Sequence, residues 1–230
     1  MALVQGTAAD TGSTASATLT ATFGTAMTAG SLLAVVVQYS GGTCAVASNG
    51  QTITSRKKSA ADGNGYFIEG FALENINGGG TTVVATFSPN EIGAMICIEE
   101  SGVATTSALD GTPNSASPGS TTAWTTGSTT TLNATDVIFI GGSGTTSPST
   151  TNTAFGGGFS AVTGTNITSG YHQNTVDGDC LAMGRQVTSS ASIYSGSGTW
   201  AASQASGGII MAFKLLSTTS LPQLTLLGAG

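Results

Sequence analysis

Two short apolar runs interrupt an otherwise polar chain. Residues 92–98, with the sequence IGAMICI, lie between a polar turn and the acidic pair Glu99–Glu100. Residues 208–213, with the sequence GIIMAF, also follow a polar turn and precede Lys214. Runs of this length are too short to cross a membrane and are typical of strands buried on both faces. We interpret them as equivalent strands of a duplicated unit.

The rest of the first half shows the alternating pattern of half-buried strands. Residues 15–23 alternate small or apolar side chains with Ser and Thr, and residues 32–37 (LLAVVV) form a second fully apolar run. Further strands are expected at 51–58, 66–74 and 81–87, separated by Gly- and Asn-rich turns at 62–65 and 77–80. Hardly any helical periodicity occurs, so the pattern predicts an all-β fold.

The second half repeats this order with a period of about 105 to 115 residues. Residues 137–142 match 32–42, residues 159–165 match 51–58, and residues 177–185 match 62–73. A half of this size should not cover both faces of its own sheet. We therefore predict a jelly-roll-like antiparallel β-sandwich built from two duplicated halves. Two separate small domains are the alternative.

This interpretation divides the chain into five parts. Residues 1–12 are expected to form an N-terminal arm, and residues 13–217 a single sandwich. Its halves, 13–103 and 128–217, are joined by residues 104–127, which are predicted to be a surface connection with one short strand at most. Residues 218–230 form an apolar tail.

The amino-acid composition excludes some classes of function but says little more about the fold. Charged residues make up only 7 % of the chain, far below the ~25 % of ordinary soluble proteins. The net charge of −6 argues against nucleic-acid binding, and the single basic cluster, Arg56–Lys57–Lys58, is typical of a solvated strand end. A surface of Ser, Thr and Gly suits packing against neighbours in a dense assembly.

The cysteines and the first residues favour a protein that is not secreted. The N-terminal sequence MALVQG lacks the basic and apolar segments of a signal peptide. Cys44, Cys97 and Cys180 are odd in number, and we interpret them as buried small hydrophobic residues, with one disulfide bridge as the alternative.

The tail carries four leucines and no charge, which is unusual for a free terminus. It either folds back along its own sandwich or docks on a neighbouring subunit. Both options remain open from the sequence, and we expect a homo-oligomer. The assembly candidates are Leu221, Leu224, Leu226 and Leu227.

Catalytic chemistry has little support in the sequence. The one histidine, His172, lies in a polar run, and no nucleophile elbow or phosphate-binding loop occurs. Glu69 lies among aromatic residues and could act as a general acid, but no second carboxyl is fixed beside it. Glu99 and Glu100 are adjacent and should point to opposite faces of a strand. We assign no catalytic residue and no cofactor.

Two acidic turns raise the question of a metal ion. Asp62 and Asn64 in one turn, and Asp177 and Asp179 in the other, offer the oxygen ligands that Ca²⁺ prefers. Plain turn chemistry explains both pairs without an ion, because Asp and Asn bond to their own turn backbone. We expect no bound metal.

One stretch resembles a known group of proteins. The strand at 92–98 and the following residues 99–112 (EESGVATTSALDGT) resemble a pattern of buried strand, glutamate, small-Gly-Val and Leu-Asp-Gly in phage-encoded and bacterial β-sandwich proteins. Residues 207–214 are similar to the way those chains end. The resemblance extends over most of 13–217 and implies a concanavalin-like or jelly-roll sandwich in virion surface or secreted multidomain proteins. It implies no catalytic residue.

The combined expectation is a non-enzymatic virion structural protein, such as a capsid-decorating or fibre-type subunit, assembled in a host cytoplasm. Its partners would be other virion proteins or further copies of itself, with no nucleic acid and no membrane. The alternative is a lectin-like carbohydrate-binding module, in which aromatic rings stack on sugars. Its candidate residues are Trp124, Trp200, Tyr66 and Tyr171.

Overall fold

The computed structural model describes residues 2–145, 151–173 and 179–216. These residues form fifteen strands, paired antiparallel, and contain no helix, so no helix of theirs could cross a membrane. The all-β antiparallel sandwich predicted from the sequence is confirmed.

The first eight strands are β1 (Ala2–Asp10), β2 (Ser16–Thr22), β3 (Leu32–Tyr39), β4 (Thr43–Ser48), β5 (Gln51–Lys58), β6 (Phe67–Leu73), β7 (Thr82–Glu91) and β8 (Gly93–Ser101). The others are β9 (Asn114–Thr130), β10 (Asp136–Thr145), β11 (Asn152–Gly156), β12 (Ser160–Ala161), β13 (Tyr171–Gln173), β14 (Asp179–Val187) and β15 (Ile193–Lys214).

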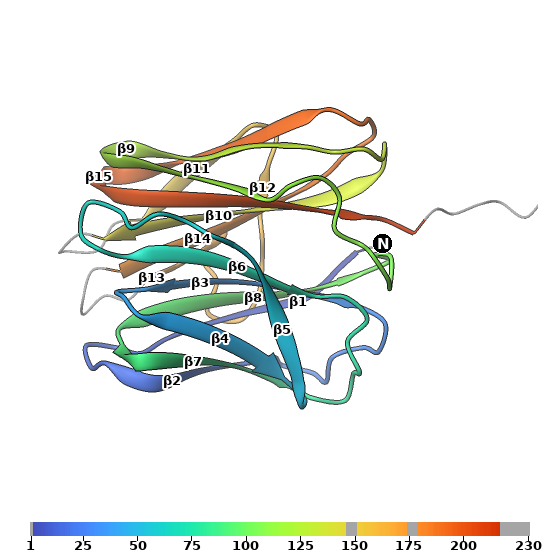
Figure 1. The fold of residues 1–230 in the computed structure, drawn as a ribbon, viewed down its shortest axis with the longest axis horizontal. Coiled ribbons are helices and arrows are strands. Elements are labelled where there is room, and N and C mark those ends of the chain that lie inside the picture. Colours follow the sequence, from blue (N-terminus) through green and yellow to red (C-terminus); the bar gives the residue numbers. More distant parts are fainter. Residues whose placement is uncertain (1, 146–150, 174–178, 217–230) are drawn as a thin grey trace, which may run out of the picture.

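Each half of the chain forms its own sheet (Figure 1). The N-terminal sheet has the order β1-β8-β3-β6-β5-β4-β7-β2 and curls until it is nearly closed. The C-terminal sheet has the order β11-β15-β10-β14-β12, with β9 paired to β15 and β13 to β14. The centres of both sheets have the same plan, because β8-β3-β6 corresponds to β15-β10-β14. This agreement matches the repeat seen in the sequence.

The two sheets pack face to face through these central strands, which are buried on both sides. Along β3, the even-numbered residues from Leu32 to Val36 enter a core shared by the two halves. The odd-numbered residues from Leu33 to Val37 enter a core that belongs to the N-terminal half. Strands β10 and β15 divide in the same way between the shared core and a C-terminal core. Each half thus folds over a core of its own as well as sharing one, which the sequence had not led us to expect.

The predicted N-terminal arm is instead an edge strand. In β1, residues from Ala2 to Asp10 pair with β8. The outer edge of β1 is also covered, because the backbone N–H of Ala8 donates to the Thr165 carbonyl at 3.0 Å. The N–H of Thr165 donates in turn to the Gly6 carbonyl at 2.9 Å. The N-terminal residues therefore join the two halves.

The predicted surface connection also contains a long strand. Strand β9 pairs along β15 from Asn114–Ile210 to Thr130–Ile193. The side chain of Asn114 donates to the Ser128 carbonyl at 2.8 Å, so the β9–β15 ribbon folds over on itself. The folded ribbon provides the outer layer of the C-terminal half.

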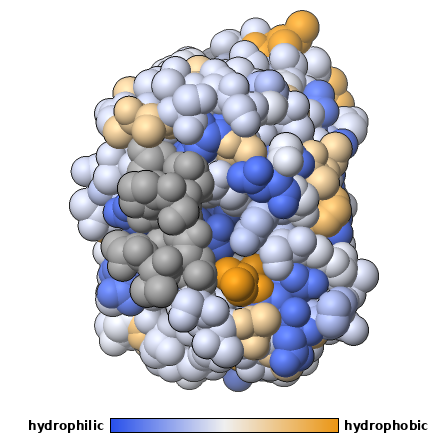
Figure 2. All heavy atoms as spheres, turned by 90° about the vertical axis from the view of Figure 1, so that its left-hand side faces the viewer, coloured by the Kyte–Doolittle hydropathy of each residue, from blue (hydrophilic) through white to orange (hydrophobic). Residues whose placement is uncertain are grey.

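The two ends of the sandwich differ in character. The exposed large hydrophobic residues of the described chain are Val4, Leu132, Val187, Ile193 and Leu216. Val4 lies near the start of β1 and Leu216 follows the end of β15, and both strand ends are on the right of Figure 1. Val187 pairs with Val137, which also pairs with Phe213 near the end of β15. Leu132 and Ile193 lie on adjoining segments close to the same strand end. We call this the apolar end. The opposite end carries the turns at 40–42 and 62–65 and the junction between β7 and β8. Figure 2 shows that its surface is mainly hydrophilic or neutral with isolated hydrophobic spots. We call it the polar end.

Candidate functional site

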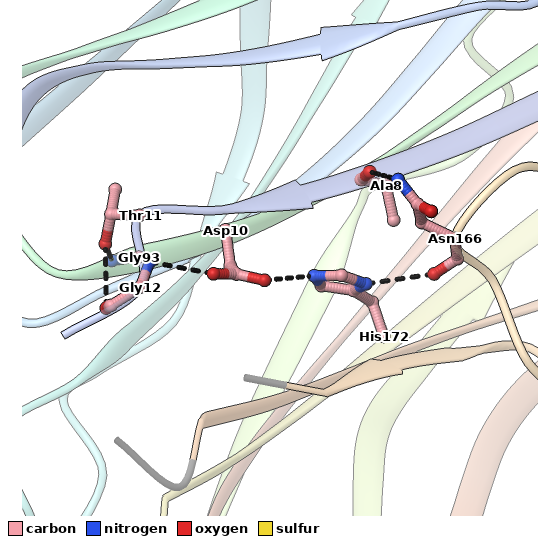
Figure 3. A network of polar contacts seen from close by, with 7 residues as sticks. All are labelled: Ala8, Asp10, Thr11, Gly12, Gly93, Asn166 and His172. Atoms are coloured by element: carbon pink, nitrogen blue, oxygen red, sulfur yellow. Dashed lines mark hydrogen bonds and ion pairs between the residues drawn. The ribbon is translucent and has the colours of Figure 1, made fainter. Parts of the chain in front are cut away.

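The single histidine joins the two halves through a polar network (Figure 3). His172 Nε2, on β13, lies 2.7 Å from Oδ2 of Asp10 at the end of β1. His172 Nδ1 lies 2.9 Å from the carbonyl oxygen of Asn166. Asn166 donates its side-chain amide to the Ala8 carbonyl at 3.2 Å, and Asp10 accepts the backbone N–H of Gly12 at 2.7 Å.

Both ring nitrogens of His172 lie within hydrogen-bond distance of an oxygen atom, so the ring is held from two sides. Within the described residues, the hydrogen-bond partners of the His172 ring are Asp10 and Asn166, and neither is a hydroxyl or thiol nucleophile. The ring borders a shallow hollow of roughly 300 Å³ that Tyr171 and Gln173 also line. This network is therefore suited to holding the halves together rather than to activating a nucleophile.

The two tryptophans proposed for sugar binding are buried. Trp124 is 0 % and Trp200 1 % exposed, with ring centroids 6.1 Å apart in the C-terminal core. Both indole N–H groups donate internally, Trp124 to Asn152 at 3.1 Å and Trp200 to Ser206 at 3.0 Å. Neither ring face is available to a sugar, so this part of the carbohydrate prediction is wrong.

Trp124 fits because two glycines leave room for its ring. A Cβ atom at Gly142 would lie 2.4 Å from the indole, and one at Gly198 would lie 2.3 Å from it. These glycines are distant from Trp124 in sequence, which explains why the surrounding Ser and Thr residues wrongly suggested exposure.

The two candidate tyrosines are half-buried and do not meet the tryptophans in one open site. Tyr66 follows the turn that Asp62 organises at the polar end. Tyr171 packs partly against the C-terminal core, beside the hollow at His172. The four aromatic candidates therefore do not form a common platform for a sugar.

Glu69 is engaged by hydroxyl groups inside the N-terminal half. The Tyr39 hydroxyl donates to its Oε2 at 2.5 Å, and the Ser55 hydroxyl donates to its Oε1. Burial, and then the bond to Glu69, raise the pKa of Tyr39. The Lys58 ammonium lies 4.0 Å from the Phe67 ring centroid, so this part of the basic cluster packs on aromatic faces. Both Glu69 oxygens thus have internal partners.

Glu99 and Glu100 do point to opposite faces of β8. Glu99 accepts the Gln5 side-chain amide and the Thr28 backbone N–H, each at 2.7 Å. Glu100 crosses to the C-terminal half, where Arg185 donates to its two oxygens at 2.7 and 2.6 Å. Glu100 is 0 % exposed. This bidentate ion pair links the halves through a buried carboxylate and a guanidinium that is 21 % exposed.

A pair of buried carboxyl groups escaped sequence analysis. Asp110 accepts the backbone N–H groups of Leu132 at 2.8 Å and Asn133 at 2.9 Å. Burial, and then the neighbouring Asp110 carboxyl group and its charge, raise the pKa of Asp136 to about 7. Burial acts in the same direction on Asp110, but the Asn133 and Leu132 N–H groups outweigh it and lower that pKa. The pair lies at the apolar end.

The acidic turn at 62–65 is organised by its own backbone. Asp62 Oδ1 accepts the N–H groups of Asn64 at 2.8 Å and Tyr66 at 3.0 Å, and its Oδ2 accepts the Thr145 hydroxyl. The Asn64 amide also donates to the Thr145 carbonyl, so this turn ties the halves together. Asp179 is buried, and Asp177 lies outside the described residues. Within the described ranges, no three His, Cys, Asp or Glu side chains are grouped to hold a metal.

The three cysteines are free thiols. Cys97 and Cys180 are buried, as predicted, whereas Cys44 is only half-buried. Burial, and then the negative charge of Glu69, raise the pKa of Cys44 to about 12. A thiol held this firmly in its protonated form is a poor nucleophile.

The outer faces of both halves are uncharged arrays of small side chains. On the N-terminal half, Thr20 pairs across strands with Val84, and Thr86 pairs with both Thr18 and Ala45. Neighbouring strands in a sheet are about 4.8 Å apart, so hydroxyl and methyl groups recur at short, regular spacing. The exposed residues of this array are Thr18, Thr20, Thr22, Thr43, Ala45, Ala47, Thr82 and Thr86. Those of the C-terminal half are Ala123, Thr125, Ser128, Thr130, Ser195 and Thr199.

The leucines proposed for assembly, Leu221, Leu224, Leu226 and Leu227, lie outside the described residues. The last described residue, Leu216, is exposed and donates its backbone N–H to the Gly102 carbonyl at 2.8 Å. The chain therefore leaves the described sandwich at the apolar end.

Comparisons with known proteins do not identify a family. No family model and no curated protein matches the chain. One solved structure, a conserved protein of unknown function from Pseudomonas aeruginosa PAO1, is similar over 87 % of this chain and 82 % of that chain, with 12 % identity and a TM-score of 0.28. A TM-score this low supports no argument about fold or function.

Proposed function

We propose that the chain is a non-enzymatic structural subunit of a virion, a capsid-decorating or fibre-type protein that assembles with other virion proteins or with itself. The observation that supports this proposal most is the pair of uncharged outer faces. They expose short hydroxyl and methyl groups, which approach a neighbouring surface closely and lose little side-chain entropy when they become buried.

The use of the ionisable groups also supports a structural role. Glu69, Glu99, Glu100 and Asp110 accept internal hydrogen bonds, and His172 bridges the halves. Catalytic carboxyl groups must reach a substrate in a groove. In this chain the charged groups stabilise the sandwich instead, and the surface is left to Ser, Thr and Ala.

The test is incorporation into particles. Particles purified from the source of the protein should contain the chain in a fixed ratio to the main capsid protein, measured by mass spectrometry and electron microscopy. The double variant Thr20→Lys/Thr86→Lys places charge on the N-terminal outer face and should lower incorporation at an unchanged melting temperature. A chain absent from all particles would refute the proposal.

One specific feature, the hollow beside Tyr171, supports carbohydrate binding as a second candidate function. Its lining combines an aromatic ring with polar groups from Asn166, Thr168 and Gln173, a mixture that suits a sugar. Binding of the purified chain on a glycan array, lost in Tyr171→Ala, would support this second candidate over the first.

A further inference from the structure

The exposed hydrophobic residues of the apolar end surround the point where the chain leaves the sandwich. Ile193 pairs with Thr130, and the N–H of Thr131 donates to the Ser192 carbonyl at 2.9 Å, so Leu132 and Ile193 lie on adjoining segments. The N–H of Leu215 donates to the Thr135 carbonyl at 3.1 Å, which brings the end of β15 beside the same turn.

Exposed hydrophobic side chains also occur where this end reaches the other half. Val187 ends β14 and lines a hollow of roughly 320 Å³ with Leu3, beside the polar residues Ser160, Arg185 and Gln186. Val4 follows Leu3 on β1. Leu132 is 79 % exposed and Ile193 is 69 % exposed. Large hydrophobic side chains grouped on a surface favour aggregation unless a partner covers them.

The carboxyl groups of this end are withdrawn from the surface. Glu99, Glu100, Asp110 and Asp136 are each at most 2 % exposed. An apolar partner therefore has none of these four carboxylates to desolvate, although Lys57 lines a hollow beside Leu132. A partner of matching chemistry is encoded in the same chain, because residues 217–230 carry four leucines and no charge.

We propose that residues 217–230 of one copy dock on the apolar end of a second copy, in a reciprocal exchange. Figure 1 shows β15 pointing out of the sandwich where it ends. The next four residues, Ser217–Ser220, are polar and span about 13 Å when extended. Leu221 precedes a proline and is biased towards an extended conformation. A linker of this length is sufficient to reach a second copy whose apolar end faces this one.

A twofold axis would make this exchange a closed dimer and not an open chain of copies. The described chain ends at the same end of the molecule as the receiving surface, so two copies related by a twofold axis could each give and receive one segment. This inference deepens the proposed assembly role, since it names the surface and its partner, but it concerns contacts between copies and is tested without any particle.

The test uses light scattering after size-exclusion chromatography over a hundredfold range of concentration. The full chain should form dimers that dissociate on dilution, and a chain lacking residues 217–230 should be a monomer with the same melting temperature. The variant Leu132→Gln/Ile193→Gln keeps its tail but loses two exposed contacts, and its dimer dissociation constant should rise at least tenfold. Ala61→Gln, at an exposed position of the polar end, is the matched control and should behave like the unaltered chain.

The sharpest test of the exchange is to mix the truncated chain with the Leu132→Gln/Ile193→Gln variant. The truncated chain has a receiving surface without a tail, and the Gln variant has a tail with a damaged surface, so an equimolar mixture should form heterodimers. A full chain that stays monomeric, with truncation lowering its melting temperature, would show that the segment covers its own sandwich and would overturn the exchange. A dimer that survives truncation would also overturn it. Either result leaves the virion role to be judged by incorporation into particles.

Discussion

The two ends of the sandwich show different solutions to the same problem, which is how a chain with few charges keeps its halves together and its surface soluble. At the polar end, the links between the halves are hydrogen bonds, some part-buried, as between His172 and Asp10, and some buried, as between Gln38 and Gly144. At the apolar end, the halves are joined by an ion pair between Arg185 and the fully buried Glu100 carboxylate, and large hydrophobic side chains are exposed. This difference is what we expect if one end faces water and the other is covered by a partner.

The largest effect is expected from breaking the ion pair of the apolar end. Arg185→Ala leaves the fully buried Glu100 without its partner, and loss of one member of a buried pair costs about 3–5 kcal/mol. The free energy of unfolding should be measured by urea denaturation. The double variant Arg185→Met/Glu100→Gln removes both charges and should recover most of the loss. Equal losses in the two variants would mean that the charges do not matter.

The second effect is a pH dependence that comes from the carboxyl pair of the same end. The pKa of Asp136 is about 7 in the folded chain, against 3.8 as its ordinary value. A raised pKa means that stability is fully present below pH 3.8 and is lost as the pH rises through about 7. The loss by pH 8 amounts to up to roughly 4 kcal/mol.

The variant Asp136→Asn tests this pH dependence, because an amide stays uncharged at any pH. Its stability relative to the unaltered chain should increase from pH 5 to pH 8, as urea denaturation at both values would show. Parallel stability curves from pH 5 to pH 8 would contradict a buried, protonated Asp136 carboxyl group.

The smallest effect is expected at the polar end. His172→Ala removes two hydrogen bonds that are partly exposed to water, so the free energy of unfolding should fall by about 1–2 kcal/mol. A loss larger than that of Arg185→Ala would reverse the comparison between the ends.

The strands at the centre of each sheet could be predicted because their sequences carry the signal themselves. Residues 32–37, 92–98 and 208–213 are apolar throughout, and this is the signature of burial on two faces. Strands β1 and β9 lack such a signal. Their pairing depends on β8 and β15, which are distant in sequence, so local pattern alone assigned them to an arm and a connection.

The candidate sites were harder to predict for a similar reason. Asp110 and Asp136 are separated by 26 positions and meet only because β9 folds over with β15 before β10 begins. Trp124 is flanked by Ala and Thr, and the glycines that make room for its ring lie on other strands. Single residues could be proposed from their type, but their neighbours required the fold.

The most direct measurement of the contrast between the ends is hydrogen exchange, followed by mass spectrometry, on the full chain at low and high concentration. Segments 128–136 and 186–194 of the apolar end should exchange more slowly at high concentration, whereas segments 60–66 and 88–93 of the polar end should not change. Truncation of residues 217–230 should abolish the difference. Protection that appears at the polar end instead, or nowhere, would contradict the claim that the apolar end is the surface through which this subunit assembles.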